Sequence, residues 1–216
     1  MEKLKNALNA FETNVKNVSN EIDLQSLFRE LAPVFLYGGY IQVRNEYKVY
    51  IRTVEFYFHS EKADGIHDPI VYHRNGRGLD VVPYFPPMTL HAHNSGFDIA
   101  FESRYREYRA SALIRAYEVI NNKGEYLLWN SKRGRFEISS KYCFNKQSTY
   151  LYTLLNGFVL EQNNNITWID EPRKMSTFPA EKTRQNVFQS EKENEYIKKK
   201  ERCTRKWSFT REEDLM

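Results

Sequence analysis

The start of the chain has apolar residues at spacings of three and four, which is the period of one face of a helix. A second helix is predicted over residues 24–31, with Asp23 and Ser26 as candidate caps and Pro33 just beyond its end. Residues 1–31 are therefore expected to form two helices. The apolar positions that define the first helix are Leu4, Ala7, Leu8, Phe11, Val15 and Val18.

After Pro33 the pattern becomes strand-like. Two β-rich stretches, 40–43 and 47–58, are separated by the turn-forming residues Arg44-Asn45-Glu46, and this arrangement predicts a β-hairpin. Position 55 lies inside its second strand. Further expected elements are strands at 88–92, 97–102, 111–117 and 126–129, a helix at 147–155 that ends before Asn156-Gly157, and a strand at 207–209.

Two segments lack this regularity. Residues 61–87 are rich in glycine and proline, and such a long irregular loop usually carries function. Residues 182–205 are charged and poor in apolar side chains, which is typical of a surface helix or a mobile excursion. The predicted fold is one α+β domain over 1–216, with helices flanking a curved, open-barrel-like, mainly antiparallel sheet. Its sheet core covers 32–178, and 206–210 forms the closing strand.

Composition narrows the class of protein. The 216 residues are 41% hydrophobic and include 15 Tyr and 14 Phe, enough to bury a core, which excludes long disorder. No apolar run is long enough for a membrane helix or a signal-peptide core, so we expect a soluble, cytoplasmic protein with no membrane partner. Cys143 and Cys203 leave no CxxC pair and argue against a disulfide framework.

Charge is concentrated in one part of the sequence. The formal net charge is +4, but residues 104–135 hold eight basic and three acidic residues, a local charge of +5. Tyr105 and Tyr108 interleave with the first arginines, and basic residues mixed with aromatics can hold phosphates while bases stack on the rings. The alternative is an ordinary solvated strand end and loop.

Two charged residues stand in apolar strands. Glu55 follows Val54 and precedes Phe56, where a carboxylate is costly unless it is paired. Arg115 lies in the apolar segment 112–117 and is the natural partner of Glu55. A buried carboxylate beside a cation is a candidate general base. The alternative is that each side chain points to solvent from a half-buried strand.

The five histidines fall in or beside the long loop. They lack the Cys, Asp or Glu spacing of a metal site, such as HExxH, and imidazole also serves as a stacking or hydrogen-bonding group in a pocket. The sequence contains no GxGxxG, GxxxxGK[ST] or GxSxG motif. We expect no metal and no cofactor. The histidines are His59, His67, His73, His91 and His93.

Taken in order, segments between about residues 31 and 209 resemble the alkyladenine (3-methyladenine) DNA glycosylase family. Leu-Ala at 31–32 resembles the end of that family's first helix. Thr-Val-Glu-Phe-Tyr at 53–57 is similar to its strand Glu-Thr-Glu-Ala-Tyr, whose second Glu is the general base. Leu-Ile-Arg-Ala-Tyr-Glu at 113–118 is similar to its strand Leu-Leu-Arg-Ala-Leu-Glu. Two shorter matches are Glu-Pro-Arg at 171–173 and Lys-Trp-Ser-Phe at 206–209.

The resemblance implies an N-glycosidic bond hydrolase that excises a flipped, alkylated purine in base-excision DNA repair. In this interpretation Glu55 deprotonates a water molecule that Arg115 holds. The base would lie among Tyr57, His67 and His93. A cationic base is already a good leaving group, so the reaction needs one carboxylate and no metal or nucleotide cofactor.

The chain also departs from the family. The tyrosine that the family wedges into the duplex maps to Ser95, and its asparagine that rejects guanine maps to Glu102. Glu102 would bring a second carboxylate to the pocket and favour bases with an amino group or a positive charge. Phe97 or a loop aromatic would replace the wedge, or the substrate would be single-stranded. The predicted DNA-contacting residues are Ser95, Gly96, Phe97, Arg104, Arg106 and Arg133.

Two other functions stay open on the sequence alone. A protein of the same fold could bind nucleic acid or a nucleoside without excising a base, which the loss of the wedge favours. An unrelated α+β structural or interaction protein is the second alternative. No obligate protein partner is expected.

Overall fold

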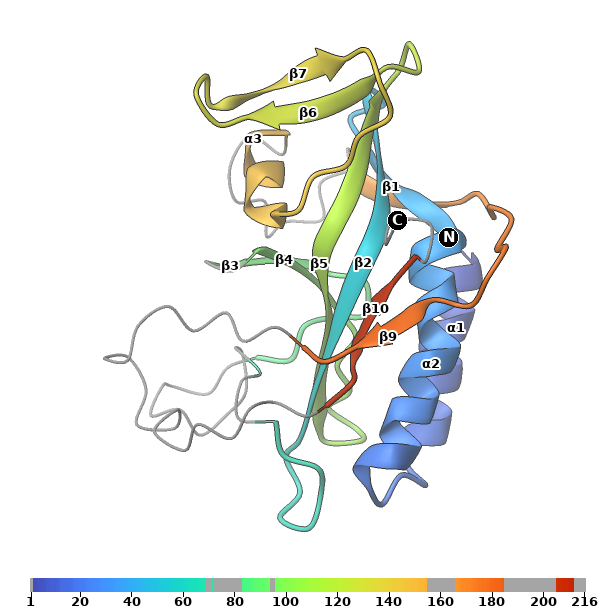
Figure 1. The fold of residues 1–216 in the computed structure, drawn as a ribbon. Coiled ribbons are helices and arrows are strands. Elements are labelled where there is room, and N and C mark those ends of the chain that lie inside the picture. Colours follow the sequence, from blue (N-terminus) through green and yellow to red (C-terminus); the bar gives the residue numbers. More distant parts are fainter. Residues whose placement is uncertain are drawn as a thin grey trace.

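Two helices pack side by side along one side of the molecule (Figure 1). The computed structural model describes residues 2–68, 71, 83–93, 96–154, 166–184 and 205–211. Helix α1 (Glu2–Val15) buries the apolar face that the sequence predicts, including Leu8 and Phe11. Its partner is α2 (Glu21–Tyr37).

Helix α2 is longer than the predicted 24–31. The true N-cap is Asn20, whose side chain accepts hydrogen bonds from the backbone of Ile22 and Asp23, so the prediction of Asp23 and Ser26 as caps is wrong. The helix also continues past Pro33. We attribute this continuation to the complete burial of Phe35 and Leu36 in its last turn, which offsets the hydrogen bond that proline cannot donate.

Within the described residues, ten strands form one sheet, and every pairing between them is antiparallel. The main path runs β3-β4-β5-β2-β1-β8, while β10 joins β2 to β9 and β6 joins β5 to β7. The sheet curls into a half-barrel, so the expected α+β class and curved antiparallel sheet are confirmed. The strands are β1 (Gly39–Val43), β2 (Tyr47–Ser60), β3 (Leu90–His93), β4 (Gly96–Ala100), β5 (Tyr108–Asn121), β6 (Tyr126–Asn130), β7 (Arg135–Ser139), β8 (Ile166–Asp170), β9 (Ala180–Lys182) and β10 (Ser208–Thr210).

The predicted hairpin is confirmed as β1 and β2. Arg44 and Asn45 both have positive φ, and the Glu46 amide donates to the Val43 carbonyl at 2.9 Å to close the turn. The helices cover this part of the sheet, where Phe28 stacks on Phe56 with ring centroids 4.7 Å apart. Burial of these rings fixes which face of β2 points to the helices.

Other boundaries differ from the prediction. Strand β5 is twice as long as the predicted 111–117, and strands β7 and β8 were not predicted because their sequences are short and carry polar residues. The predicted helix at 147–155 is a 3-10 turn (Ser148–Tyr150) followed by α3 (Leu151–Leu154). Its stop signal, Asn156-Gly157, and most of 182–205 lie outside the described residues.

The two long central strands, β2 and β5, are each interrupted once. Their register passes from Ile51–Tyr117 to Thr53–Ala116 and then to Val54–Ile114, so it skips Arg52 on β2 and Arg115 on β5. Each skipped residue is a β-bulge, which turns its side chain relative to its neighbours. Both bulge residues are arginines that reach buried glutamates.

Candidate active site

Glu55 lies at the centre of the sheet, between Leu113 of β5 and Ser208 of β10. Its neighbours Val54 and Phe56 belong to the main core, so the alternation of β2 turns Glu55 to the opposite face. The residue is only 1% exposed. A carboxylate at this position requires partners that compensate its lost hydration.

Two side chains satisfy the Glu55 carboxylate. Arg115 Nε donates to Oε2 at 2.6 Å, and the Tyr57 hydroxyl donates to Oε1 at 2.9 Å. Arg115 Nη2 also donates to the Tyr57 hydroxyl oxygen at 3.2 Å, which closes a ring of three hydrogen bonds. The expected partnership of Glu55 and Arg115 is therefore found, and the contact is direct. We call these residues the Glu55 triad.

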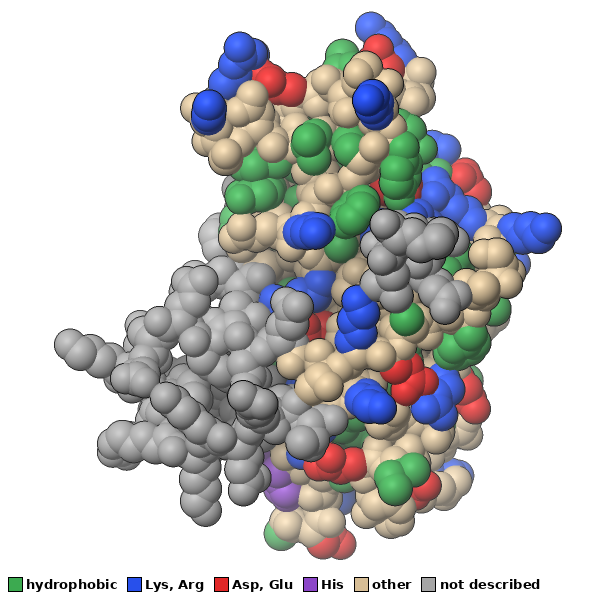
Figure 2. All heavy atoms as spheres, viewed as in Figure 1, with side chains coloured by type: hydrophobic (Ala, Val, Ile, Leu, Met, Phe, Trp, Pro, Cys, Tyr) green, Lys and Arg blue, Asp and Glu red, His purple; other side chains and the backbone are tan. Residues whose placement is uncertain are grey.

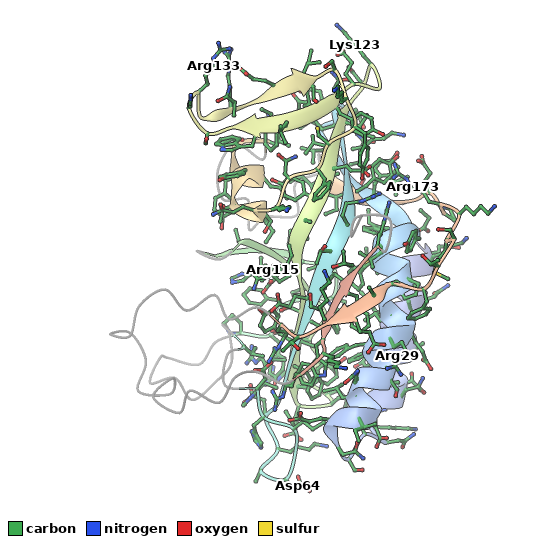
Figure 3. All side chains as sticks on the ribbon, viewed as in Figure 1. Arg29, Asp64, Arg115, Lys123, Arg133 and Arg173 are labelled. Carbon is green, nitrogen blue, oxygen red and sulfur yellow. The ribbon has the colours of Figure 1, made fainter. Side chains whose placement is uncertain are left out.

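Burial, and after it the charge of Glu55, raises the pKa of Tyr57 well above its usual value, so the hydroxyl keeps the proton that it donates. Burial alone would lower the pKa of Arg115, but the oxygens of Tyr57 and Glu55 outweigh it and raise the pKa. The guanidinium stays charged. The Arg115 side chain is 18% exposed, whereas that of Glu55 is 1% exposed, so solvent reaches the triad from the arginine side. Figure 3 shows Arg115 on the side of β5 away from the helices.

The ring of Tyr57 lies beneath another arginine. The guanidinium carbon of Arg184 is 4.7 Å from the Tyr57 ring centroid and 4.9 Å from that of Trp207. Arg184 Nη1 donates to Asp68 at 2.5 Å and to the Phe56 carbonyl at 3.3 Å. Arg184 lies in the charged segment 182–205, whose pattern predicted a surface helix or a mobile excursion and gave no sign of this buried contact. One face of the ring expected to support a base is thus covered by a cation.

Of the expected base-pocket histidines, His67 is exposed, and its ring meets the edge of His59 with centroids 5.0 Å apart. Its Nε2 lies 3.3 Å from the Ala63 carbonyl. The His93 backbone ends β3, but its side chain lies outside the described residues, as does Ser95. The sandwich of Tyr57, His67 and His93 stays a prediction.

Glu102 belongs to a different network. Its Oε2 accepts from the Phe85 amide at 2.8 Å and from Arg109 Nη1 at 3.3 Å, and its side chain is fully buried. Arg109 pairs in register with His59, four residues along β5 from the partner of Glu55, which is about 13 Å at strand spacing. These contacts place Glu102 in an ion pair outside the Glu55 triad, and its role as a second pocket carboxylate stays a prediction.

The expected replacement for the wedge is buried. Phe97 is 4% exposed and packs edge-on against Tyr152, with ring centroids 4.7 Å apart. At Gly96 a Cβ atom would lie 2.1 Å from the Ser148 hydroxyl. Both residues are buried, and β4 lies against the 3-10 turn at Ser148, whose hydroxyl accepts a hydrogen bond from the Phe97 amide, so the prediction that Gly96 and Phe97 contact DNA is corrected.

The basic segment 104–135 does not form one surface. Arg104 and Arg106 lie in the turn before β5, whereas Arg133 lies in the turn between β6 and β7, beyond the other end of β5. Fourteen residues of strand separate the two groups by about 45 Å. Sequence proximity suggested one patch, but the length of β5 divides it.

Three further observations bear on ligands and relatives. Among the described residues, no three His, Cys, Asp or Glu side chains gather as metal ligands would. None of the described helices has the length and apolar character needed to cross a bilayer. Comparison with family models, curated proteins and solved structures found no match. The site must therefore be interpreted from its own geometry.

Proposed function

We propose that this protein hydrolyses the N-glycosidic bond of an alkylated purine in nucleic acid, with Glu55 as the general base. The observation that carries the proposal is a carboxylate 1% exposed, held between Arg115 and Tyr57 on the sheet face away from the helices. The order of sequence segments that resemble the glycosylase family supports the same chemistry.

In this mechanism Arg115 orients a water molecule at its exposed side. Each Glu55 oxygen keeps a lone pair after its one hydrogen bond, so the carboxylate can still accept a proton from water. The hydroxide that forms attacks the anomeric carbon of the sugar, and the bond to the base breaks with its electron pair going to the base. A cationic alkylated base is neutralised by that pair and leaves without a separate acid.

Arg184 limits where a base can stack. A purine on the covered face of Tyr57 would have to take the place of the guanidinium, which Asp68 and the Phe56 carbonyl hold. A cationic base would use the same attraction for the ring that Arg184 uses now. If a cationic alkylated base replaced the Arg184 guanidinium on the Tyr57 ring, the ring would still contact a cation, which a neutral base could not provide.

A second candidate is binding of nucleic acid or a nucleoside without excision. It is favoured by the engagement of both Glu55 oxygens and by the cover that Arg184 places on Tyr57. Under this alternative the Glu55 triad would hold strands β2 and β5 together, and its carboxylate would not activate water.

The two candidates are separated by measuring release of alkylated bases from methylated duplex DNA. We expect release by the wild-type protein and a loss of about 10²–10⁴-fold in Glu55→Gln. Glu171→Gln is the matched control, because Glu171 also accepts from a tyrosine hydroxyl and a cation, here Tyr50 and Lys48, but outside the triad. Wild-type protein that binds DNA without releasing a base would favour the second candidate, and release unaffected by Glu55→Gln would remove Glu55 as the base.

A further inference from the structure

Strands β6 and β7 form a two-stranded hairpin that extends beyond the end of β5 (Figure 1). We call residues 122–141 the β6–β7 arm. It joins the sheet through Val119 and Ile120 of β5. On one face, Trp129 stacks on Tyr150 with ring centroids 4.5 Å apart and so fixes the arm to the body.

The arm carries a local excess of positive charge. It contains five basic residues and two acidic ones, which gives a net charge of +3. The basic residues gather at the two ends of the arm. Figure 3 shows Lys123 and Arg133 at opposite ends, and Figure 2 shows basic side chains at both. The basic residues are Lys123, Lys132, Arg133, Arg135 and Lys141.

Hydrogen bonds preform the tip of the arm. The Asn130 side-chain oxygen accepts a hydrogen bond from the Lys132 amide, and the Asn130 backbone carbonyl accepts one from the Gly134 amide. Gly134 adopts the positive φ that this turn requires. Arg133 and Arg135 both donate to Glu137, at 2.8 and 3.1 Å, yet their side chains are 63% and 66% exposed. A rigid tip presents its cations at a small entropic cost.

The turn at Arg104 and Arg106, at the other end of β5, lacks such an excess. Arg104 and Arg106 share their turn with Glu107, and Glu12 bonds to Ser103 in the same turn. The Glu107 carbonyl accepts the Glu61 amide, which brings the acidic loop at 61–64 beside it. The arm is therefore the better match for a polyanion.

We propose that the β6–β7 arm binds double-stranded nucleic acid by lying in the major groove. A two-stranded ribbon fits a groove about 12 Å wide. Five-residue strands span about 16 Å, so the basic ends reach phosphates on both sides of the groove. Leu128, 43% exposed on the face away from Tyr150, lies between these ends. This inference rests on the proposed function only for its nucleic-acid substrate.

The test measures binding to an undamaged 25-base-pair DNA duplex by fluorescence anisotropy at several salt concentrations. Replacing both Arg133 and Arg135 with Gln should weaken binding and reduce the slope of log affinity against log salt by about one unit for every phosphate that the variant no longer neutralises. Glu137→Gln should tighten binding several-fold, because it frees both arginines. Replacing both Arg104 and Arg106 with Gln is the matched control, since it removes the same number of charges at the other end of β5.

The outcomes keep this inference separate from the catalytic proposal. Glu55→Gln should bind undamaged duplex with the affinity of the wild type. Loss of base release with unchanged binding would therefore support the role of the arm in binding. An unchanged salt slope in the Arg133/Arg135 double variant, an equal loss in the Arg104/Arg106 double variant, or no duplex binding by wild type at low salt would each overturn the assignment. Circular dichroism of every variant checks that the fold is intact.

Discussion

Strands β2 and β5 are joined by two buried arginine–glutamate pairs that differ in one respect. Glu55 of β2 meets the bulge residue Arg115 of β5, and Glu118 of β5 meets the bulge residue Arg52 of β2. Both glutamates are 1% exposed. Glu118 forms ion pairs with two arginines, because Arg173 adds a contact at 3.2 Å to that of Arg52, whereas Glu55 has one arginine and a neutral hydroxyl.

The surroundings of the Glu118 pair are strongly cationic. Burial, and after it the charge of Arg52, lowers the pKa of Arg211 to about 10. Removing Glu118 would therefore leave several guanidiniums close together. We therefore expect the carboxylate held by two cations to contribute more to the stability of the fold than the carboxylate held by a single cation and a hydroxyl.

The largest expected difference between the pairs is in stability. Glu118→Ala should lower the free energy of unfolding by about 3–5 kcal/mol, because it leaves Arg52 buried beside other cations. Glu55→Ala should cost about 1–3 kcal/mol, since Arg115 can turn toward water from its partly exposed position. Urea denaturation at neutral pH measures both values. A larger loss in Glu55→Ala than in Glu118→Ala would reverse the assignment of anchor and functional site.

A smaller effect is expected from the hydroxyl that distinguishes the Glu55 triad. Tyr57→Phe keeps the ring but removes the donor to Glu55 and the acceptor for Arg115, so it should destabilise the protein by about 1–2 kcal/mol. Tyr50→Phe is the matched control, because the Tyr50 hydroxyl donates to Glu171 in a more exposed setting. It should cost less than about 1 kcal/mol. If urea denaturation gave equal losses of unfolding free energy for Tyr57→Phe and Tyr50→Phe, burial of the triad would add nothing to the contribution of its hydroxyl to stability.

The sequence predicted the pairing at Glu55 but not its detail. Charges inside two apolar strands, at Glu55 and Arg115, were sufficient to suggest that the two side chains meet. The bulges could not be predicted, because they arise from the register between strands about sixty residues apart. Likewise, Arg184 covers Tyr57 from 127 positions further along the chain, a tertiary contact with no local signal.

The fold shows the same division. Local patterns were sufficient for the first helix, the β1–β2 hairpin and the antiparallel class, because alternation and turn residues encode them. The other features depend on tertiary burial, which favours the continuation of α2 past Pro33 and the position of Phe97 in the core. It also made β5 long enough to divide the basic residues between two ends of the molecule.

The smallest effect concerns a partly exposed counterpart of Glu118. Glu137 in the β6–β7 arm also pairs with two arginines, and hydrogen bonds from Asn130, Arg133 and Arg135 lower its pKa to about 2. A carboxylate whose pKa is lower in the folded state stabilises that state above its ordinary pKa of about 4.5, and the contribution is lost as pH falls toward 2. Because Glu137 is partly exposed, the effect on stability should be slight, but its titration is measurable by carbon NMR of the carboxyl group. We expect a midpoint near pH 2 in the wild-type protein and a midpoint closer to 4.5 when Arg133 and Arg135 are both replaced by Gln. A midpoint near 4.5 in the wild type would mean that solvent separates Glu137 from its arginines, so that the tip would already present their charges and Glu137→Gln would no longer tighten duplex binding.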